Sequence, residues 1–324
     1  MPVRFTSPSL GGQRESFLQK GQWEIGLAFR HLYADKWFIG SKVDEITVLG
    51  GHPLYLDINT LDLSASYGVS ERLSLTLTLP FMHGSQSRFY ADTARHEVST
   101  FGLGDITLIG NRWMLDPLTH AAGNISLGLG IKAPTGNNRV QQDNSLANGV
   151  MARSTSDQGI QKGDGGWGIL VQMQAFHRLA SGLSGYLFGS YMLSPRERTD
   201  VPAPGNPKLV GLTLSVPDAY TARGGLAFAL VPAAGLSSSL GLRIDGIPLR
   251  DVIGGGDDGF RRPGYTLFVD PGVSWRRGPN DFTFSVPLRL HQNFPQGLID
   301  RERGFPGGGD LADYLIFAGY THRF

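Results

Sequence analysis

Apolar and polar residues alternate along most of this chain, and this period-two pattern constrains the fold more than any other sequence feature. Twelve segments follow it: 22–33, 61–67, 73–79, 104–114, 124–132, 166–177, 183–193, 219–230, 236–246, 265–275, 281–291 and 311–324. In the first segment, the apolar face carries Trp23, Ile25, Leu27 and Phe29. Helical periodicity does not extend over any long segment. The sequence therefore predicts an all-β protein with about 12 strands.

Hydropathy separates two kinds of membrane protein. No apolar run approaches the roughly 18 residues that a membrane-spanning helix needs, which excludes a helical inner-membrane protein. A spanning strand needs only about 10 residues, of which every second one is apolar, so a mean hydropathy of -0.12 is compatible with a membrane barrel. Because an open sheet in lipid would leave unpaired backbone groups, we expect a single closed antiparallel transmembrane β-barrel over residues 22–324. Residues 1–21 would form a periplasmic N-terminal arm or a segment in the lumen.

The connections between the predicted strands fall into two length classes that alternate strictly. The short ones are 68–72, 115–123, 178–182, 231–235 and 277–280; the long ones are 34–53, 82–101, 133–165, 194–218, 247–264 and 293–310. Short turns on one side and long loops on the other are typical of bacterial outer-membrane barrels. We therefore expect periplasmic turns, extracellular loops and both termini in the periplasm. A soluble β-sandwich or lectin is the alternative, and it would need no detergent for extraction.

Aromatic residues gather near the ends of the apolar face. The short-turn side has Trp23, Tyr67, Trp275, Phe282 and Phe324, and the loop side has Phe81, Trp167, Tyr220 and Tyr265. Two such rings predict the aromatic girdles of a membrane barrel, although aromatic residues also favour the cores of soluble sheets. The terminal Phe324, which closes a strand of alternating pattern, resembles the end of bacterial outer-membrane barrels.

Composition and the N-terminus narrow the function classes. With a net charge of +1 and no basic run of five residues, nucleic acid is not an expected partner. The chain has no Cys, which removes disulfides and thiolate sites and is compatible with an oxidising compartment. No apolar core follows the first residues as it would in a signal peptide, so for an exported protein we expect this sequence to be the mature form.

Three motifs occur in order within residues 55–324: GLGDITL at 102–108, IKAPTGN at 131–137 and DDGFRRPGY at 257–265. They resemble the outer-membrane transporter family named for meta-pathway phenol degradation. The resemblance implies passage of small, often aromatic or hydrophobic compounds across the outer membrane, and it supplies no catalytic set. Residues before 55 and the loop 138–165 contain no matching motif.

Polar side chains opposite the apolar face are the candidate lumen-lining residues. They are Glu24, Arg30, Asp62, Asp105, Gln172, Gln174, Arg223, Arg243, Asp245, Asp270 and Arg289. Strand order predicts an arginine side (Arg223, Arg243, Arg289) facing an acidic side (Glu24, Asp62, Asp105), with loop 138–165 as a constriction. Alternatively, the same charges pair and fill the barrel, because charges removed from water must be paired or hydrated. Twelve strands are compatible with a narrow channel and with a filled barrel.

Other chemical motifs are weak. The string Gly254-x-Gly256-x-x-Gly259 is followed by Phe-Arg-Arg-Pro, which cannot open the helix of a dinucleotide site. Glycine-aspartate clusters occur at 163–166, 255–258 and 308–310, but they lack the ligand spacing of a calcium-binding loop. Because Gly and Asp are common in turns, we interpret these clusters as turns, with loop-bound calcium as the alternative. Neither close His pairs nor a G-x-S-x-G elbow occurs, so we predict no metal, no cofactor and no enzyme.

The sequence thus favours an outer-membrane channel for passive, substrate-biased diffusion of small solutes. The alternatives are a barrel without a pore that has a structural or partner-binding role and, less favoured, an outer-membrane lipid hydrolase. The expected partners are membrane lipid and lipopolysaccharide, the barrel assembly machinery through the C-terminal strand, and a small-molecule solute.

Overall fold

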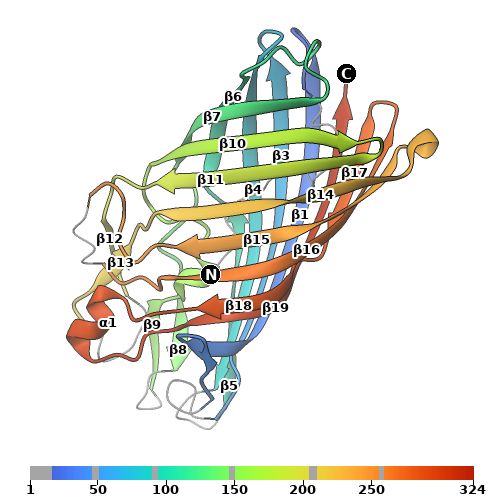
Figure 1. Ribbon diagram of the computed structural model, residues 1–324. Coiled ribbons are helices and arrows are strands. Elements are labelled where there is room, and N and C mark those ends of the chain that lie inside the picture. Colours follow the sequence, from blue (N-terminus) through green and yellow to red (C-terminus); the bar gives the residue numbers. More distant parts are fainter. Residues whose placement is uncertain (1–16, 46–50, 90–93, 146–149, 204–209, 255–258) are drawn as a thin grey trace.

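The computed structural model describes residues 17–45, 51–89, 94–145, 150–203, 210–254 and 259–324, and these form an antiparallel β-barrel (Figure 1). Its wall strands are β1 (Trp23–Ile39), β3 (Tyr55–Gly68), β4 (Leu73–Phe89), β6 (Ile106–Trp113), β7 (Gly123–Ala133), β10 (Gly168–Ala180), β11 (Leu183–Leu193), β14 (Ala219–Val231), β15 (Leu236–Ile247), β16 (Gly264–Arg277), β17 (Asn280–Ser285) with β18 (Leu288–Asn293), and β19 (Gly309–Arg323). The first strand, β1, pairs with the last, β19, from Glu24–Arg323 to Phe38–Gly309. With β17 and β18 taken as one strand position, the predicted closed barrel of 12 strands is confirmed.

Side chains alternate between an exposed apolar face and a buried face of polar and small residues. The clearest example is β7, where the exposed side chains are Ile125, Leu127, Leu129 and Ile131. Between them lie Ser126, Gly128 and Gly130, and Asn124 and Lys132 flank the run; Asn124, Ser126 and Lys132 are all buried. Since successive strand residues point to opposite faces, the sequence pattern directly gives an apolar exterior and a polar interior.

Aromatic residues mark both ends of the apolar exterior. On β16, Tyr265 and Trp275 share the outer face and are separated by ten positions, which corresponds to about 33 Å along a strand. At a tilt of about 40°, this is about 25 Å along the barrel axis, the usual height of the apolar band of an outer-membrane barrel.

One predicted strand is interrupted. Residues 281–291 were expected to form one strand, but β17 ends at Ser285 and β18 begins at Leu288. Pro287 has no N–H to donate to a neighbouring strand, and the Val286 N–H instead donates to the carbonyl of Pro271 at 3.2 Å. After this break, β18 pairs with β16, and its one register pair with β19 is Leu288–Tyr314.

The long connections carry structure of their own. Predicted loop 82–101 is largely strand, because β4 extends to Phe89 and β5 (Arg95–Leu103) pairs with it. The other connections contain β2 (Lys42–Val43), the hairpin of β8 (Gln141–Ser145) and β9 (Met151–Thr155), the pair β12 (Arg198–Pro202) and β13 (Thr213–Ser215), and the helix α1 (Leu298–Arg303). A 3₁₀ turn, η1 (Gln158–Ile160), follows β9, and another, η3 (Pro232–Ala234), lies in a short connection. No helix in these described segments is long and apolar enough to cross a membrane.

Some predictions concern residues outside the described ranges. Most of the expected N-terminal arm, residues 1–16, and the glycine-aspartate cluster at 255–258 belong to this group. The described end of the arm lies beside the first short turn, where the Gly21 N–H donates to the Gly68 carbonyl at 2.8 Å.

Candidate functional site

Two buried ion pairs connect strands inside the barrel, one between the adjacent strands β1 and β3 and one between β14 and β16, which are separated by β15. A guanidinium nitrogen of Arg30 on β1 lies 3.1 Å from an Asp62 carboxylate oxygen on β3. Nε of Arg223 on β14 lies 3.6 Å from an oxygen of Asp270 on β16. All four side chains are buried, and Asp270 is only 1% exposed. Neither Asp270 oxygen accepts a hydrogen bond from the described residues, so Arg223 is the main compensation for its charge.

A second group of interior charges lies around Arg243. Its Nε donates to Asp245 at 2.8 Å, and Asp245 also accepts from the Thr221 hydroxyl at 2.6 Å. The Arg243 guanidinium lies 4.5 Å from the ring centroid of Phe317 on β19. An arginine stacked on an aromatic ring and paired with a carboxylate is held in one orientation.

Four further predicted lumen residues lie at three places in the barrel, and Asp105 is described below with Lys132. Glu24 pairs with Arg323 at 3.0 Å across the seam that closes the barrel. Gln172 and Gln174 are half-buried on the inner face of β10, where the Gln172 amide donates to the Ser190 hydroxyl at 3.4 Å. Arg289 forms an ion pair with Asp313, which also pairs with Lys36. The Arg289 guanidinium lies 4.8 Å from the ring centroid of Phe38.

The predicted separation of an arginine side from an acidic side is wrong. Arg223, Arg243 and Arg289 each have a carboxylate within ion-pair distance on their own strand or a nearby one. The acidic residues expected to face them pair with other cations: Asp62 with Arg30, Glu24 with Arg323 and Asp105 with Lys132. The physical reason is that charges removed from water are costly unless they are paired locally, and each of these charges has a partner of opposite sign close by.

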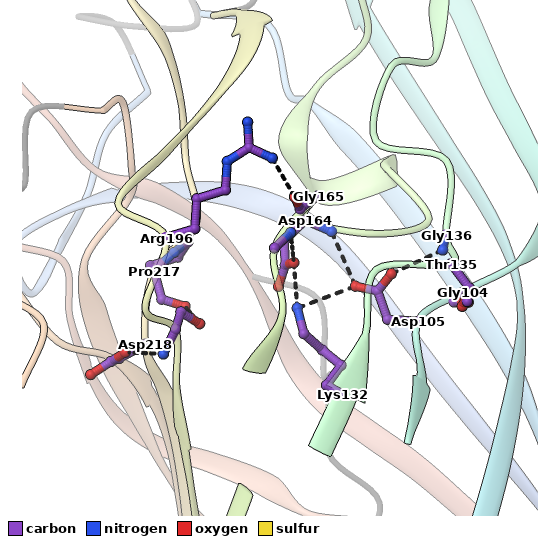
Figure 2. Close-up of polar contacts among 12 residues, drawn as sticks. Gly104, Asp105, Lys132, Thr135, Gly136, Asp164, Gly165, Arg196, Pro217 and Asp218 are labelled. Atoms are coloured by element: carbon purple, nitrogen blue, oxygen red, sulfur yellow. Dashed lines mark hydrogen bonds and ion pairs between the residues drawn. The ribbon is translucent and has the colours of Figure 1, made fainter. Parts of the chain in front are cut away.

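Lys132 joins the first two sequence motifs to a third segment of the chain (Figure 2). Its ammonium pairs with Asp164 and lies 3.4 Å from Asp105, and all three side chains are buried. The Gly136 N–H donates to Asp105 at 2.9 Å, and the Thr135 hydroxyl donates to the Gly104 carbonyl at 2.7 Å. Residues that are 27 to 32 positions apart are thereby fixed at one point of the barrel rim.

We call the contacts of Lys132 with Asp105 and Asp164 the first anchor. A second anchor is formed by Arg262, which belongs to the third sequence motif, and Asp157. Arg262 lies 3.9 Å from Asp157, the N-cap of η1, and its guanidinium covers the ring of Trp37 at 4.3 Å. Burial alone would raise the pKa of Asp157. The Arg262 charge and the hydrogen bond from the Gly159 N–H favour the ionised form more strongly, and they hold this pKa below its ordinary value. Asp157 is therefore ionised at neutral pH.

Between the two anchors, residues 157–166 pass over the interior, and we call them the plug segment. Ile160 is completely buried in an apolar cluster whose members come from β1, β3, β4, β5, β16 and β19. Its carbonyl accepts the Thr100 hydroxyl at 2.6 Å. The Gln161 amide bonds to the backbone of Val140 and Ser156. The plug segment lies within the predicted constriction, loop 138–165, except for its last residue.

Five residues of this arrangement are absent from the predicted lumen-lining set: Lys132, Asp157, Ile160, Asp164 and Arg262. Lys132 and Arg262 belong to the quoted motifs and Asp164 to the glycine-aspartate cluster 163–166, but the sequence did not assign them this role. Lys132 occupies an inward position of a predicted strand, so the strand parity could have found it. The others lie in long connections, where no periodic pattern says which side chains enter the barrel.

The predicted girdle residues are all on the outer face. Trp23 contacts Tyr67 at 4.7 Å between ring centroids, Trp275 contacts Phe282 at 5.4 Å, and Phe324 is 66% exposed. At the other end, Trp167 is 59% exposed, Tyr220 stacks on Tyr191 and Tyr265 contacts His291; Phe81 shares its outer face with Leu77 and Leu79. Within the described segments, no three His, Asp or Glu side chains form a group that could hold a metal ion.

The architecture is similar to that of a known protein. An outer membrane channel from Pseudomonas putida F1 shares 16% sequence identity, with a TM-score of 0.63 over 98% of this chain and 99% of that one. This chain therefore shares the β-barrel fold of that channel. The toluene transporter TbuX of Ralstonia pickettii has a TM-score of 0.44 at 10% identity over 95% and 90% of the two chains. The translocator domain of the autotransporter NalP from Neisseria meningitidis has 0.46 at 12% identity over the same shares. These two likenesses are too weak to carry an argument. No protein-family profile and no curated protein matches the chain.

Proposed function

We propose that this protein is an outer-membrane channel for the passive, substrate-biased diffusion of small solutes. The observation that carries the proposal is the division of one closed wall into two faces. The outer face is an apolar band of about 25 Å that ends in aromatic residues at both sides, which suits a lipid bilayer. The inner face carries paired charges and amides, which suits a solvated or solute-filled interior rather than a lipid contact.

The interior supports solutes with an apolar part. Its charges are locally neutralised, so a strong preference for ions of one sign is not expected. Beside the charged layer lies the apolar cluster around Ile160, which contains Phe268 and Phe317. An apolar or aromatic solute could pass from this cluster to the arginines stacked on aromatic rings, such as Arg243 on Phe317. This is consistent with the aromatic and hydrophobic compounds that the sequence resemblance implies.

The remaining assignments follow from this function. Residues 22–324 would form the membrane barrel, and residues 1–21 a periplasmic arm or lumen segment. The eleven polar residues predicted from strand parity would line the solute path, and the nine aromatic residues would form the two girdles. The long loops would be extracellular and contact lipopolysaccharide, and the C-terminal strand would engage the barrel assembly machinery.

A barrel without a pore is the second candidate, and one observation favours it. The plug segment and the mid-barrel side chains are buried, with Asp164, Ile160 and Asp270 at 5%, 0% and 1% exposure. An interior packed in this way would not conduct unless the plug segment moved.

Single-channel conductance in a planar bilayer separates the two candidates. We expect the detergent-purified, heat-modifiable protein to show openings that become more frequent when both anchors are weakened, in a variant with Lys132→Met and Arg262→Gln. A folded variant that remains silent would refute the channel and would direct attention to the loops and their partners. The same recording without residues 1–21 tests whether the arm also blocks the path.

A further inference from the structure

Ile160 lies where the barrel wall leaves room for it. It packs against the inner face of β3, β4 and β5, at a position where β4 has Gly84 in mid-strand. A Cβ atom on Gly84 would lie 3.1 Å from Cγ2 of Ile160 and 3.1 Å from Cε of Met82. A methyl group at position 84 would therefore press on Ile160 and on the end of Met82, so the missing side chain of Gly84 leaves part of the space that Ile160 fills.

Apolar side chains surround this space. Leu56 and Ile58 come from β3, Met82 from β4 and Val98 from β5, and each is at most 9% exposed. We call these four residues and Gly84 the Ile160 site. A site of this composition contains no hydrogen-bonding side chain of its own, so its affinity depends on the shape and apolar surface of what fills it.

The backbone that delivers Ile160 is held by polar contacts outside the site. The Ile160 carbonyl accepts the Thr100 hydroxyl, and Gln158 donates to the Ser215 carbonyl at 3.3 Å. The ion pairs of Asp157 and Asp164 anchor the two ends of the plug segment. The segment thus combines one apolar side chain inserted into the wall with anchors that can break independently of it.

We propose that the Ile160 site is a binding site for small apolar solutes. Ile160 fills the site when no solute is bound, and the solute displaces it. Since an empty apolar space of this kind is unfavourable and accepts small hydrocarbons, solute entry and departure of Ile160 would be coupled. Binding would then favour the state in which the plug segment has moved, because a ligand shifts an equilibrium by its differential affinity for the two states. This inference rests on the proposed channel function.

The test uses the full chain, with benzene as the apolar probe. In the wild type, benzene should increase the open probability. In Ile160→Ala, basal opening should rise about 30-fold or more, from the usual cost of truncating a buried isoleucine, and benzene should add little because nothing remains to be displaced. The matched control is Arg262→Gln, which weakens an anchor and leaves the site intact, so its response to benzene should persist.

A thermal measurement tests the site independently of conductance. Benzene should raise the unfolding midpoint of Ile160→Ala, whose vacated site it can fill, and should do so much less in the double variant with Gly84→Ala, where the added methyl group occupies part of that space. Ile160→Val serves as a milder replacement if the alanine variant does not fold.

The outcomes distinguish this inference from the channel itself. Openings that respond to benzene in the wild type and in Arg262→Gln, but not in Ile160→Ala, support it. Openings in all variants without any effect of benzene on conductance or stability would overturn it and leave the channel standing. Silence in every folded variant would refute the channel, and with it the coupling of binding to opening.

Discussion

Replacing Lys132 by methionine should release one end of the plug segment. The Lys132 side chain is 6% exposed, and the carboxylates that it pairs with, Asp105 and Asp164, are 9% and 0% exposed. Removing one partner of a buried ion pair typically costs about 3–5 kcal/mol, because the other charge stays buried. Here the two carboxylates keep backbone N–H donors, including that of Gly136, so we take the lower end, about 3 kcal/mol.

This cost predicts a measurable local opening. At about 1.36 kcal/mol per tenfold change, 3 kcal/mol corresponds to roughly a 160-fold increase in the open population of the segment. Amide hydrogen exchange of residues 157–166 in the detergent-solubilised protein should accelerate by about this factor, while amides in the barrel strands stay protected.

A nearby lysine provides the control. Lys162 belongs to the plug segment and donates to the Phe101 carbonyl at 3.0 Å. Lys162→Met should therefore cost only about 1 kcal/mol, the usual net contribution of one hydrogen bond. In addition, Asp164→Asn should recover part of the loss in Lys132→Met, because it removes a buried charge that has lost its partner. An acceleration below about 10-fold in Lys132→Met, or one equal to that in Lys162→Met, would refute the reasoning.

Three further predictions concern other parts of the molecule. Because the pKa of Asp157 lies below its ordinary value of 3.8, its anchor should be complete above that pH and be lost as the pH falls through the lower folded value; Arg262→Gln should move acid-induced opening to higher pH in bilayer recordings. Val269→Arg places a charge near the middle of the apolar band and should destabilise the folded barrel by about 2–4 kcal/mol in lipid vesicles, whereas a soluble sheet would show no dependence on lipid. Arg223→Met should cost about 3–5 kcal/mol in denaturant unfolding by leaving the Asp270 charge buried; a loss below 1 kcal/mol would contradict the assigned pairing.

The wall of the barrel could be predicted from the sequence because it depends on local chemistry. Alternation of period two sets which side chains face outward, and it placed every girdle aromatic on the exposed face. The same parity placed Arg30, Asp62 and Arg223 inside. It could not foresee the break before Leu288, since whether Pro287 interrupts a strand depends on what the neighbouring strands require at that position.

The partners of the interior charges were decided by tertiary structure alone. Strand parity predicts that Arg223 and Asp270 point inward, but only the register of three strands brings them together. Strand order instead suggested that Arg223 faces Glu24, Asp62 and Asp105 across the barrel. The plug segment lies still further from sequence reasoning, because Asp157, Ile160 and Asp164 belong to a connection without periodicity. Their positions depend on contacts with Arg262, Gly84 and Lys132, which are distant in the chain and become neighbours only when the barrel closes.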